Sequence, residues 1–188
     1  MTAERFTDDQ LMAKIANNEE PAFRLLVDRW EKQIHAFFWR MTGNQEDARD
    51  LAQDVFVQVH AHAGRYQAND KFKSWLFRIA GNRVRSWARR KKIVEWVRFD
   101  NFRHDRQDDT AGPGAAIEAD ETKAMVRAAI AELPDRQREA LVLRRYHEMS
   151  QQQIAATMET TEGAVESLLV RAMQTLRTRL ARTLEEES

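Results

Sequence analysis

The sequence predicts an all-α protein of two small helical domains joined by a flexible linker, the C-terminal domain containing a helix-turn-helix. Apolar residues recur at helical spacing through most of the 188 residues, and no segment shows the alternation typical of a strand. Only six Gly and three Pro interrupt the chain. Residues 98–118 differ in composition, because charges of both signs alternate there around a Gly-Pro-Gly sequence. We therefore expect domains at residues 1–97 and 119–188, with the linker at 98–118.

The N-terminal domain is expected to contain three helices. The first runs from about Phe23 to a stop at Gly43-Asn44, since Gly favours the end of a helix. Its apolar positions are Phe23, Leu26, Val27, Trp30, Ile34, Phe37, Phe38 and Met41. The second has one apolar face, made by Ala48, Leu51, Ala52, Val55, Phe56 and Val59. After a loop at about 64–70, the third spans about 72–92, with Trp75, Leu76, Ile79 and Val84 inward.

The C-terminal domain is expected to be helical from residue 119 onward. Residues 119–132 form its first helix, and Pro134 opens the second in its first turn, where a missing N–H has no cost. The second helix is expected to point four residues inward: Ala140, Leu141, Leu143 and Tyr146. Two further helices follow with a very short turn between them. Ser150 with Gln153 has the pattern of a capping box, and Thr160 or Thr161 caps the last helix.

These last two helices have the pattern of a helix-turn-helix that lays its second helix in a DNA major groove. The buried stripe of that helix is predicted to be Val165, Leu168, Leu169, Ala172 and Leu176. The outward residues are then Glu162, Gly163, Glu166, Ser167, Val170 and Arg171. An ordinary helical hairpin facing water is the alternative interpretation. Glu166 either accepts a hydrogen bond from cytosine N4 or is simply solvated.

A second candidate nucleic-acid surface lies upstream, where cations and aromatic residues are mixed. Six cations fall within ten residues without one acid: Arg83, Arg85, Arg89, Arg90, Lys91 and Lys92. Aromatic residues lie nearby in sequence: Tyr66, Phe72, Trp75, Phe77 and Trp87. This combination suits single-stranded DNA, because cations follow the phosphates and rings stack on exposed bases. The alternative is that the rings pack in the core and the cations form a solvated helix end.

Composition limits the other classes of function. The chain has 30 basic and 30 acidic residues, so nucleic-acid binding must come from local patches. No cysteine is present, which excludes disulfides and thiolate zinc sites. We expect no membrane insertion and a cytoplasmic location, since no long apolar run and no export signal is seen. We expect no cofactor, no metal and no enzyme activity, because the histidines form no metal motif: His35, His60, His62, His104 and His147.

Four strings in this order resemble the extracytoplasmic function (ECF) sigma factors of the sigma-70 family. They are AFRLLVDRW, EDARDLAQDVFVQV, FKSWLFRIAGNRVRSWARRKK and ELPDRQREALVLRRYHEMSQQQIAATMETTEGAVESLLVRAMQTLR. The resemblance covers roughly residues 20–92 and 119–180. It implies a factor that directs RNA polymerase core to promoters, with sigma region 2 in the first domain and region 4 in the second. It also implies control by an anti-sigma factor.

The resemblance also implies residue roles. The helix containing DLAQDVF would dock on the clamp helices of the largest catalytic subunit of polymerase, and region 4 would contact the polymerase flap. The docking residues would be Asp50, Leu51, Gln53, Asp54 and Phe56. Leu51 and Phe56 are alternatively core residues, which favours Gln53 and Asp54 as the contacts.

For promoter DNA, the resemblance places base capture in the loop from Tyr66 to Lys71 and strand binding on the third helix. The candidate minus-ten residues are Tyr66, Lys71, Lys73, Trp75, Arg78, Asn82, Arg83, Arg85, Ser86 and Arg89. The candidate minus-thirty-five residues are Gly163, Glu166, Ser167, Val170 and Arg171. Many relatives have a basic residue in place of Glu166 and Arg in place of Leu168, so the resemblance leaves the minus-thirty-five sequence preference open, though not the docking mode. A free-standing regulator that binds duplex DNA without polymerase is the alternative function.

Overall fold

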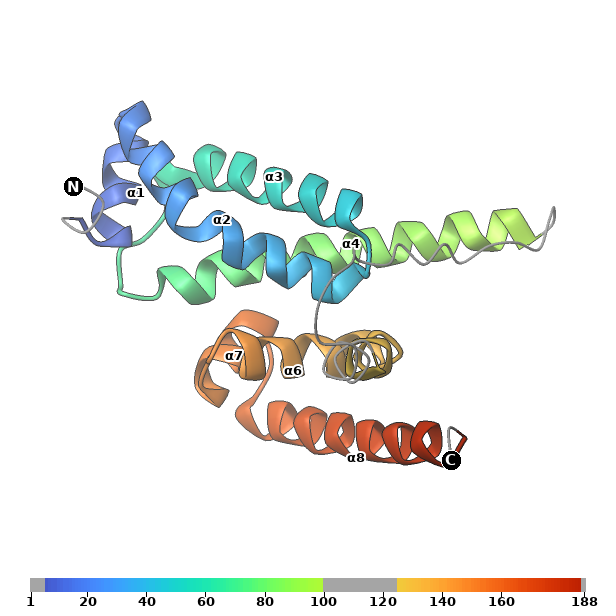
Figure 1. Cartoon of the computed structure of the whole chain (residues 1–188). Helices are drawn as coiled ribbons and strands as arrows, with labels where there is room; N and C mark the ends of the chain where they lie inside the picture. The colour runs from blue at the N-terminus through green and yellow to red at the C-terminus, as the bar shows by residue number, and fades with distance from the viewer. Residues whose placement is uncertain (1–5, 100–124, 187–188) are drawn as a thin grey trace, which may run out of the picture.

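The structure is a computed structural model that describes residues 6–99 and 125–186, with side chains described over 6–91 and 125–182. All regular structure within these ranges is helical, which confirms the predicted fold class (Figure 1). The elements are α1 (Asp8–Ala16), α2 (Glu20–Thr42), α3 (Gln45–His62), the short 3₁₀ helix η1 (Ala63–Arg65), α4 (Phe72–Phe99), α6 (Asp135–Tyr146), α7 (Gln151–Met158) and α8 (Glu162–Glu186). Residues 125–131 are also helical. The domain boundaries stay predictions, and most of the expected linker lies outside the described residues.

Local sequence signals explain where the N-terminal helices begin and end. Gly43 follows α2 with a φ of +69°, a left-handed conformation that glycine adopts without strain, and its N–H donates to the Trp39 carbonyl. Asn44 then caps α3 by accepting from the Asp47 N–H at 2.9 Å. Helix α1 was not predicted, although Thr7 and Gln10 form a complete capping box at its start.

Helix α4 is longer than the predicted 72–92, since it continues to Phe99. No Gly or Pro occurs between Gly81 and Phe99, so no residue there breaks the helix.

The C-terminal helices confirm the predicted helix-turn-helix. Ser150 and Gln153 form the capping box of α7, and the Thr161 hydroxyl accepts from the Ala164 N–H at the start of α8. Pro134 is the N-cap of α6 rather than a residue of its first turn. The inward placement of Tyr146 was wrong, because its side chain is 40% exposed. Tyr146 ends α6, and the Arg40 guanidinium lies over its ring at 4.0 Å.

The two halves of the chain pack against each other, with α6 and α7 lying against α2 and α4 (Figure 1). One buried apolar cluster contains residues of both halves, including Phe37 and Phe77 from the first and Leu143 and Ile154 from the second. A smaller cluster lies within the second half and consists of Ala129, Ile130, Leu133, Leu141, Ala172 and Leu176. This arrangement places surfaces of α4 beside the helix-turn-helix.

Candidate nucleic-acid and protein interfaces

The predicted base-capture residues lie together where the loop before α4 meets the start of that helix. Tyr66, Lys71, Trp75 and Arg78 line one hollow of about 260 Å³. The Tyr66 and Trp75 rings meet edge to face with centroids 4.8 Å apart. Trp75 is half-buried, so its ring both packs on the protein and borders the hollow. The arrangement offers aromatic surface beside two cations, which suits an unstacked base.

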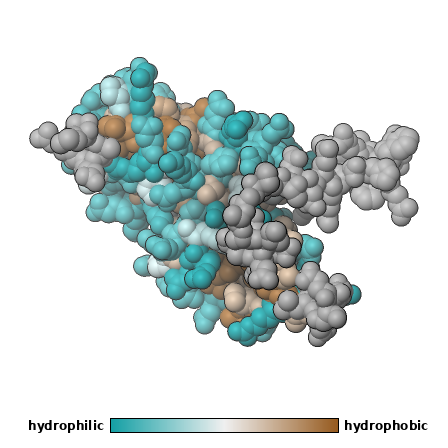
Figure 2. Space-filling model, viewed as in Figure 1, coloured by the Kyte–Doolittle hydropathy of each residue, from teal (hydrophilic) through white to brown (hydrophobic). Residues whose placement is uncertain are grey.

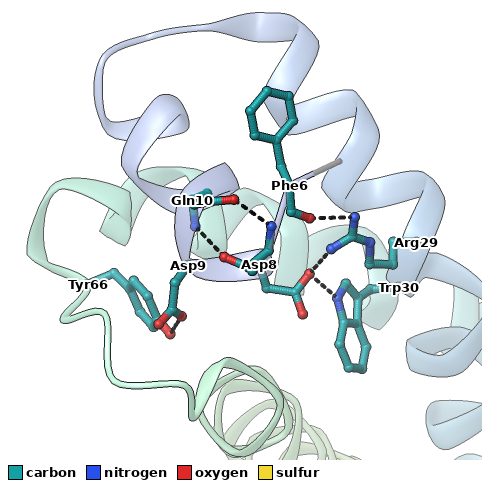
Figure 3. A network of polar contacts seen from close by, with 8 residues as sticks. Phe6, Asp8, Asp9, Gln10, Arg29, Trp30 and Tyr66 are labelled. Carbon is teal, nitrogen blue, oxygen red and sulfur yellow. Dashed lines mark hydrogen bonds and ion pairs between the residues drawn. The ribbon is translucent and has the colours of Figure 1, made fainter. Parts of the chain in front are cut away.

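Helix α1 holds this loop in place (Figure 3). The Tyr66 hydroxyl donates to Asp9 Oδ1 at 2.5 Å, and the Asp70 N–H donates to the other oxygen of Asp9 at 2.9 Å. Burial raises the pKa of Tyr66, and the charge of Asp9 raises it further. The neighbouring Asp8 accepts from Arg29 at 2.6 Å and from the Trp30 indole N–H at 3.2 Å. Two adjacent carboxylates therefore connect the loop to α2.

Along α4, several predicted DNA residues already have protein partners. Arg85 makes an ion pair with Glu139 of α6, and its second nitrogen donates to Asn82 at 2.7 Å. Lys73 donates to the His147 carbonyl at 2.5 Å. Two other contacts stay within the first domain: Arg83 lies 3.7 Å from Asp54, and Arg89 donates to Ser86 at 3.1 Å.

The predicted polymerase-docking residues separate into two groups. Leu51 and Phe56 are 4% and 7% exposed, so the structure places both in the core. Asp50, Gln53 and Asp54 lie on the exposed face of α3.

The sequence did not reveal an apolar groove of about 700 Å³ between α2 and α3. It is lined by Phe23, Val27, Phe56 and Val57 and bordered by polar groups that include Gln53 and Arg49. Val57 is 57% exposed, and an apolar residue off the buried stripe was the available signal. Apolar surface is visible among polar side chains over the N-terminal helices in Figure 2.

The outer face of α8 is open to solvent as predicted. All six residues expected to face outward are exposed: Glu162, Gly163, Glu166, Ser167, Val170 and Arg171. The Ser167 hydroxyl donates to the Gly163 carbonyl at 3.0 Å. Met173, which the sequence reasoning missed, is 45% exposed beside Val170 at 50%. The helix therefore presents mixed polar and apolar side chains of the kind that contact base edges and thymine methyl groups.

Two buried titratable residues of the second half were not predicted. Glu139 is 1% exposed, and burial raises its pKa, although the Arg85 charge opposes that shift. His147 is 5% exposed, with its ring 4.5 Å from that of Phe77 and its Nε2 without a hydrogen-bond partner. Burial lowers the pKa of His147 to about 4, and the charges of Arg40 and Lys73 lower it in the same direction. Both residues lie where the two halves meet.

Other kinds of site find no support in the part of the chain that the structure describes. Residues 6–99 and 125–186 hold no cluster of His, Cys, Asp or Glu arranged to bind a metal ion. The predicted non-ligand His104 lies outside these residues. Over the same ranges, no helix combines the length and the apolar character needed to cross a bilayer.

These features define a two-part helical protein with a helix-turn-helix in its second half. The first half matches the family described as Sigma-70 region 2 over residues 26–93, and the second matches Sigma-70, region 4 over residues 123–176. The chain belongs to the sigma-70 family, as an ECF-type sigma factor, and its function is to direct promoter-specific initiation. The resemblance stated from the sequence is thereby confirmed.

Curated relatives match over nearly the whole chain. RNA polymerase sigma-H factor of Pseudomonas aeruginosa is 29% identical over 177 residues, which is 90% of this chain and 91% of the relative. The ECF sigma-E factor of Escherichia coli is 26% identical and covers 93% and 94% of the two chains. Among solved structures, CnrH in complex with the cytosolic domain of CnrY is 26% identical, with a TM-score of 0.70 and coverage of 93% and 97%.

A second solved structure supports the fold alone. The sigma factor RpoE of Bartonella quintana, in complex with the anti-sigma factor NepR, is 23% identical with a TM-score of 0.69. It covers 85% of this chain and 96% of its own.

Proposed function

We propose that this sigma factor docks on RNA polymerase core through α3, melts the minus-ten element with α4 and its preceding loop, and reads the minus-thirty-five element with α8. The observation that carries the proposal is the presence of two separate candidate DNA surfaces, one of rings and cations and one on an exposed recognition helix. One suits unpaired bases and the other suits duplex DNA. A factor of this kind acts where polymerase acts, in the bacterial cytoplasm.

For polymerase docking, the exposed residues Gln53 and Asp54 supply polar contacts beside the apolar groove. An amphipathic helix of the polymerase clamp fits such a surface, because its apolar side chains enter the groove while its polar ones meet the rim. Leu51 supports the helix from inside, whereas Phe56, although mostly buried, contributes to the lining of the groove.

For strand opening, the hollow between Tyr66 and Trp75 receives a base extruded from the minus-ten element. Unstacking a base costs on the order of a few kcal/mol, which aromatic stacking of about 1–3 kcal/mol per base helps to offset. Lys71 and Arg78 at the same hollow attract the adjoining phosphates. The polymerase, not this chain, forms the phosphodiester bonds.

For duplex recognition, α8 enters the major groove with Gly163, Glu166 and Ser167 nearest its N-terminal end. Val170 and Arg171 lie one turn further along. Gly163 has open space around the position of a Cβ atom, which allows a close approach to DNA. Polymerase fixes the two domains at one separation, so that two weak DNA contacts act together at a high effective concentration.

An anti-sigma factor is the proposed regulator. Among similar solved structures, CnrH is in complex with the cytosolic domain of CnrY, and RpoE of Bartonella quintana is in complex with the anti-sigma factor NepR. In this chain the groove between α2 and α3 is the surface where such a regulator would compete with polymerase.

Reconstituted transcription with core polymerase tests these assignments. Arg85→Ala and Asn82→Ala should impair strand opening, measured by permanganate reactivity of unpaired thymines. Ser167→Ala and Arg171→Ala should weaken upstream recognition, measured by footprinting. Thr178→Ala is the matched control, because Thr178 is exposed on the same α8 but lies beyond the recognition face. Unchanged initiation by all four variants would refute the residue assignments.

A further inference from the structure

An ion pair crosses from the second half of the chain to a residue that the proposed function assigns to DNA. Glu139 on α6 contacts Arg85 on α4, with Arg85 Nη1 2.8 and 2.9 Å from the two carboxylate oxygens. The Glu139 side chain is 2% exposed and the Arg85 side chain 27%. A carboxylate that engages a guanidinium through both oxygens presents the same charge and acceptor pattern as a phosphate.

The helix opposite Glu139 is shaped to receive it. Gly81 is buried in the interior of α4, where glycine is unfavourable for the helix itself. A Cβ atom on Gly81 would overlap Oε1 of Glu139. Gly81 therefore forms a notch in α4 that the carboxylate fills, one helical turn from Arg85.

The same interface covers other parts of the proposed minus-ten surface. Lys73 donates to the His147 carbonyl, and the buried Thr157 hydroxyl donates to the Ser74 carbonyl at 3.4 Å. Ala156 of α7 lines the hollow of Tyr66 and Trp75. By contrast, the groove proposed for polymerase is lined only by residues of α2 and α3.

We propose that Glu139 takes the place of a promoter phosphate in the free protein. Its carboxylate fills the notch at Gly81, pairs with Arg85 and so keeps the two halves together; we call this contact the Glu139 latch. The inference rests on the proposed function, since it concerns regulation of the proposed minus-ten surface. In the closed state Lys73 and Arg85 of α4 are engaged by the second half, while the polymerase-docking face stays open. Polymerase therefore binds first, and separation of the two halves then exposes Arg85 to the DNA strand.

Two substitutions test the latch from opposite sides. Glu139→Gln keeps the size of the side chain but removes its charge, and Gly81→Ala fills the notch. Glu148→Gln is the matched control, because it removes the same charge from an exposed position in the same half. The chain has no native cysteine, so Glu46→Cys on α3 and Thr178→Cys on α8 allow a fluorescent donor and acceptor to be attached to the full chain.

Energy transfer between the dyes reports closure, and anisotropy of a labelled single-stranded oligothymidylate reports DNA binding without polymerase. We expect Glu139→Gln and Gly81→Ala both to lose energy transfer and to bind the oligothymidylate about tenfold or more tightly. Removing one partner of a buried ion pair strongly destabilises the arrangement that contains it, so the closed state is lost and Arg85 becomes available to DNA. The control should match the wild type in both measurements. Circular dichroism of each variant checks that helical content is kept.

The outcomes separate the latch from the proposed function. Unchanged energy transfer in both variants, or opening without tighter DNA binding, would overturn the latch. Promoter-directed transcription by the wild type with core polymerase is measured in parallel. Its absence, combined with opening and tighter binding by the variants, would overturn the proposed function and not the closure by Glu139.

Discussion

His147 makes the closed arrangement sensitive to acid. Its ring comes from the second half of the chain but packs against Phe77 at 4.5 Å and Phe37 at 5.9 Å, both in the first half. Arg40 and Lys73 add positive charge around it. A protonated imidazole is therefore disfavoured there, both because it loses water and because it meets two cations.

The size of the effect follows from the pKa of His147, which falls from an ordinary value of 6.5 to about 4. Between these values the unfolded chain binds more protons than the native one, so the free energy of unfolding falls as the pH drops below 6.5. The full loss is about 3 kcal/mol, and about 2 kcal/mol of it is lost between pH 7.5 and pH 5. The raised pKa of Glu139 acts in the opposite direction.

Urea unfolding of the wild type and of His147→Phe at pH 7.5 and pH 5 measures this contribution. The variant keeps an aromatic ring but cannot be protonated, and Glu139 is present in both proteins, so its contribution cancels in the comparison. We expect the wild type to lose about 2 kcal/mol more than the variant on acidification. Equal losses in the two proteins would refute the reasoning.

Three further substitutions have expected effects on stability, each measured by urea unfolding at pH 7.5. Phe77→Ala should cost about 3–5 kcal/mol, because the fully buried ring contacts both halves and leaves a cavity. Gly43→Ala should cost about 1 kcal/mol or more through backbone strain alone, since its φ is +69° and its surroundings are open. Tyr66→Phe should cost about 1 kcal/mol, because it leaves Asp9 without the hydroxyl donor.

Each of these predictions has a contrasting result. Val57→Ala, at an exposed apolar position, should be nearly neutral, and a cost for it equal to that of Phe77→Ala would contradict the assignment of the core. Gly43→Asn should be milder than Gly43→Ala, because Asn tolerates the left-handed region. A Tyr66→Phe protein as stable as the wild type, with an equally ordered loop by hydrogen exchange, would show that the contact with Asp9 contributes nothing.

Sequence signals a few residues apart predicted the helices well, but they could not predict packing between residues distant in sequence. The stop at Gly43 and the capping box of Ser150 involve residues a few positions apart, so the sequence displays them directly. The capping box of Thr7 and Gln10 at the start of α1 is the same kind of short-range signal. The exposed face of α8 followed from helical periodicity alone.

The contacts between the two halves could not be predicted in this way. Arg85 and Glu139 are 54 positions apart, and nothing in the local pattern links them. Glu139 lies in a charged stretch of sequence and would ordinarily be solvated, yet the structure buries it. Periodicity likewise placed Tyr146 inward without knowledge that α6 ends beside Arg40.

Helix α1 should affect promoter opening although none of its residues is proposed to contact DNA. Asp8 is tied to Arg29 and Trp30 of α2, while Asp9 accepts from the Tyr66 hydroxyl (Figure 3). Asp9 also accepts from the Asp70 amide. Together, Asp8 and Asp9 fix the position of the base-capture loop relative to α2. A genetic screen for promoter-opening defects should therefore return substitutions at Asp8 and Asp9 as well as in α4, and a bulky fusion partner next to α1 should weaken opening more than polymerase affinity.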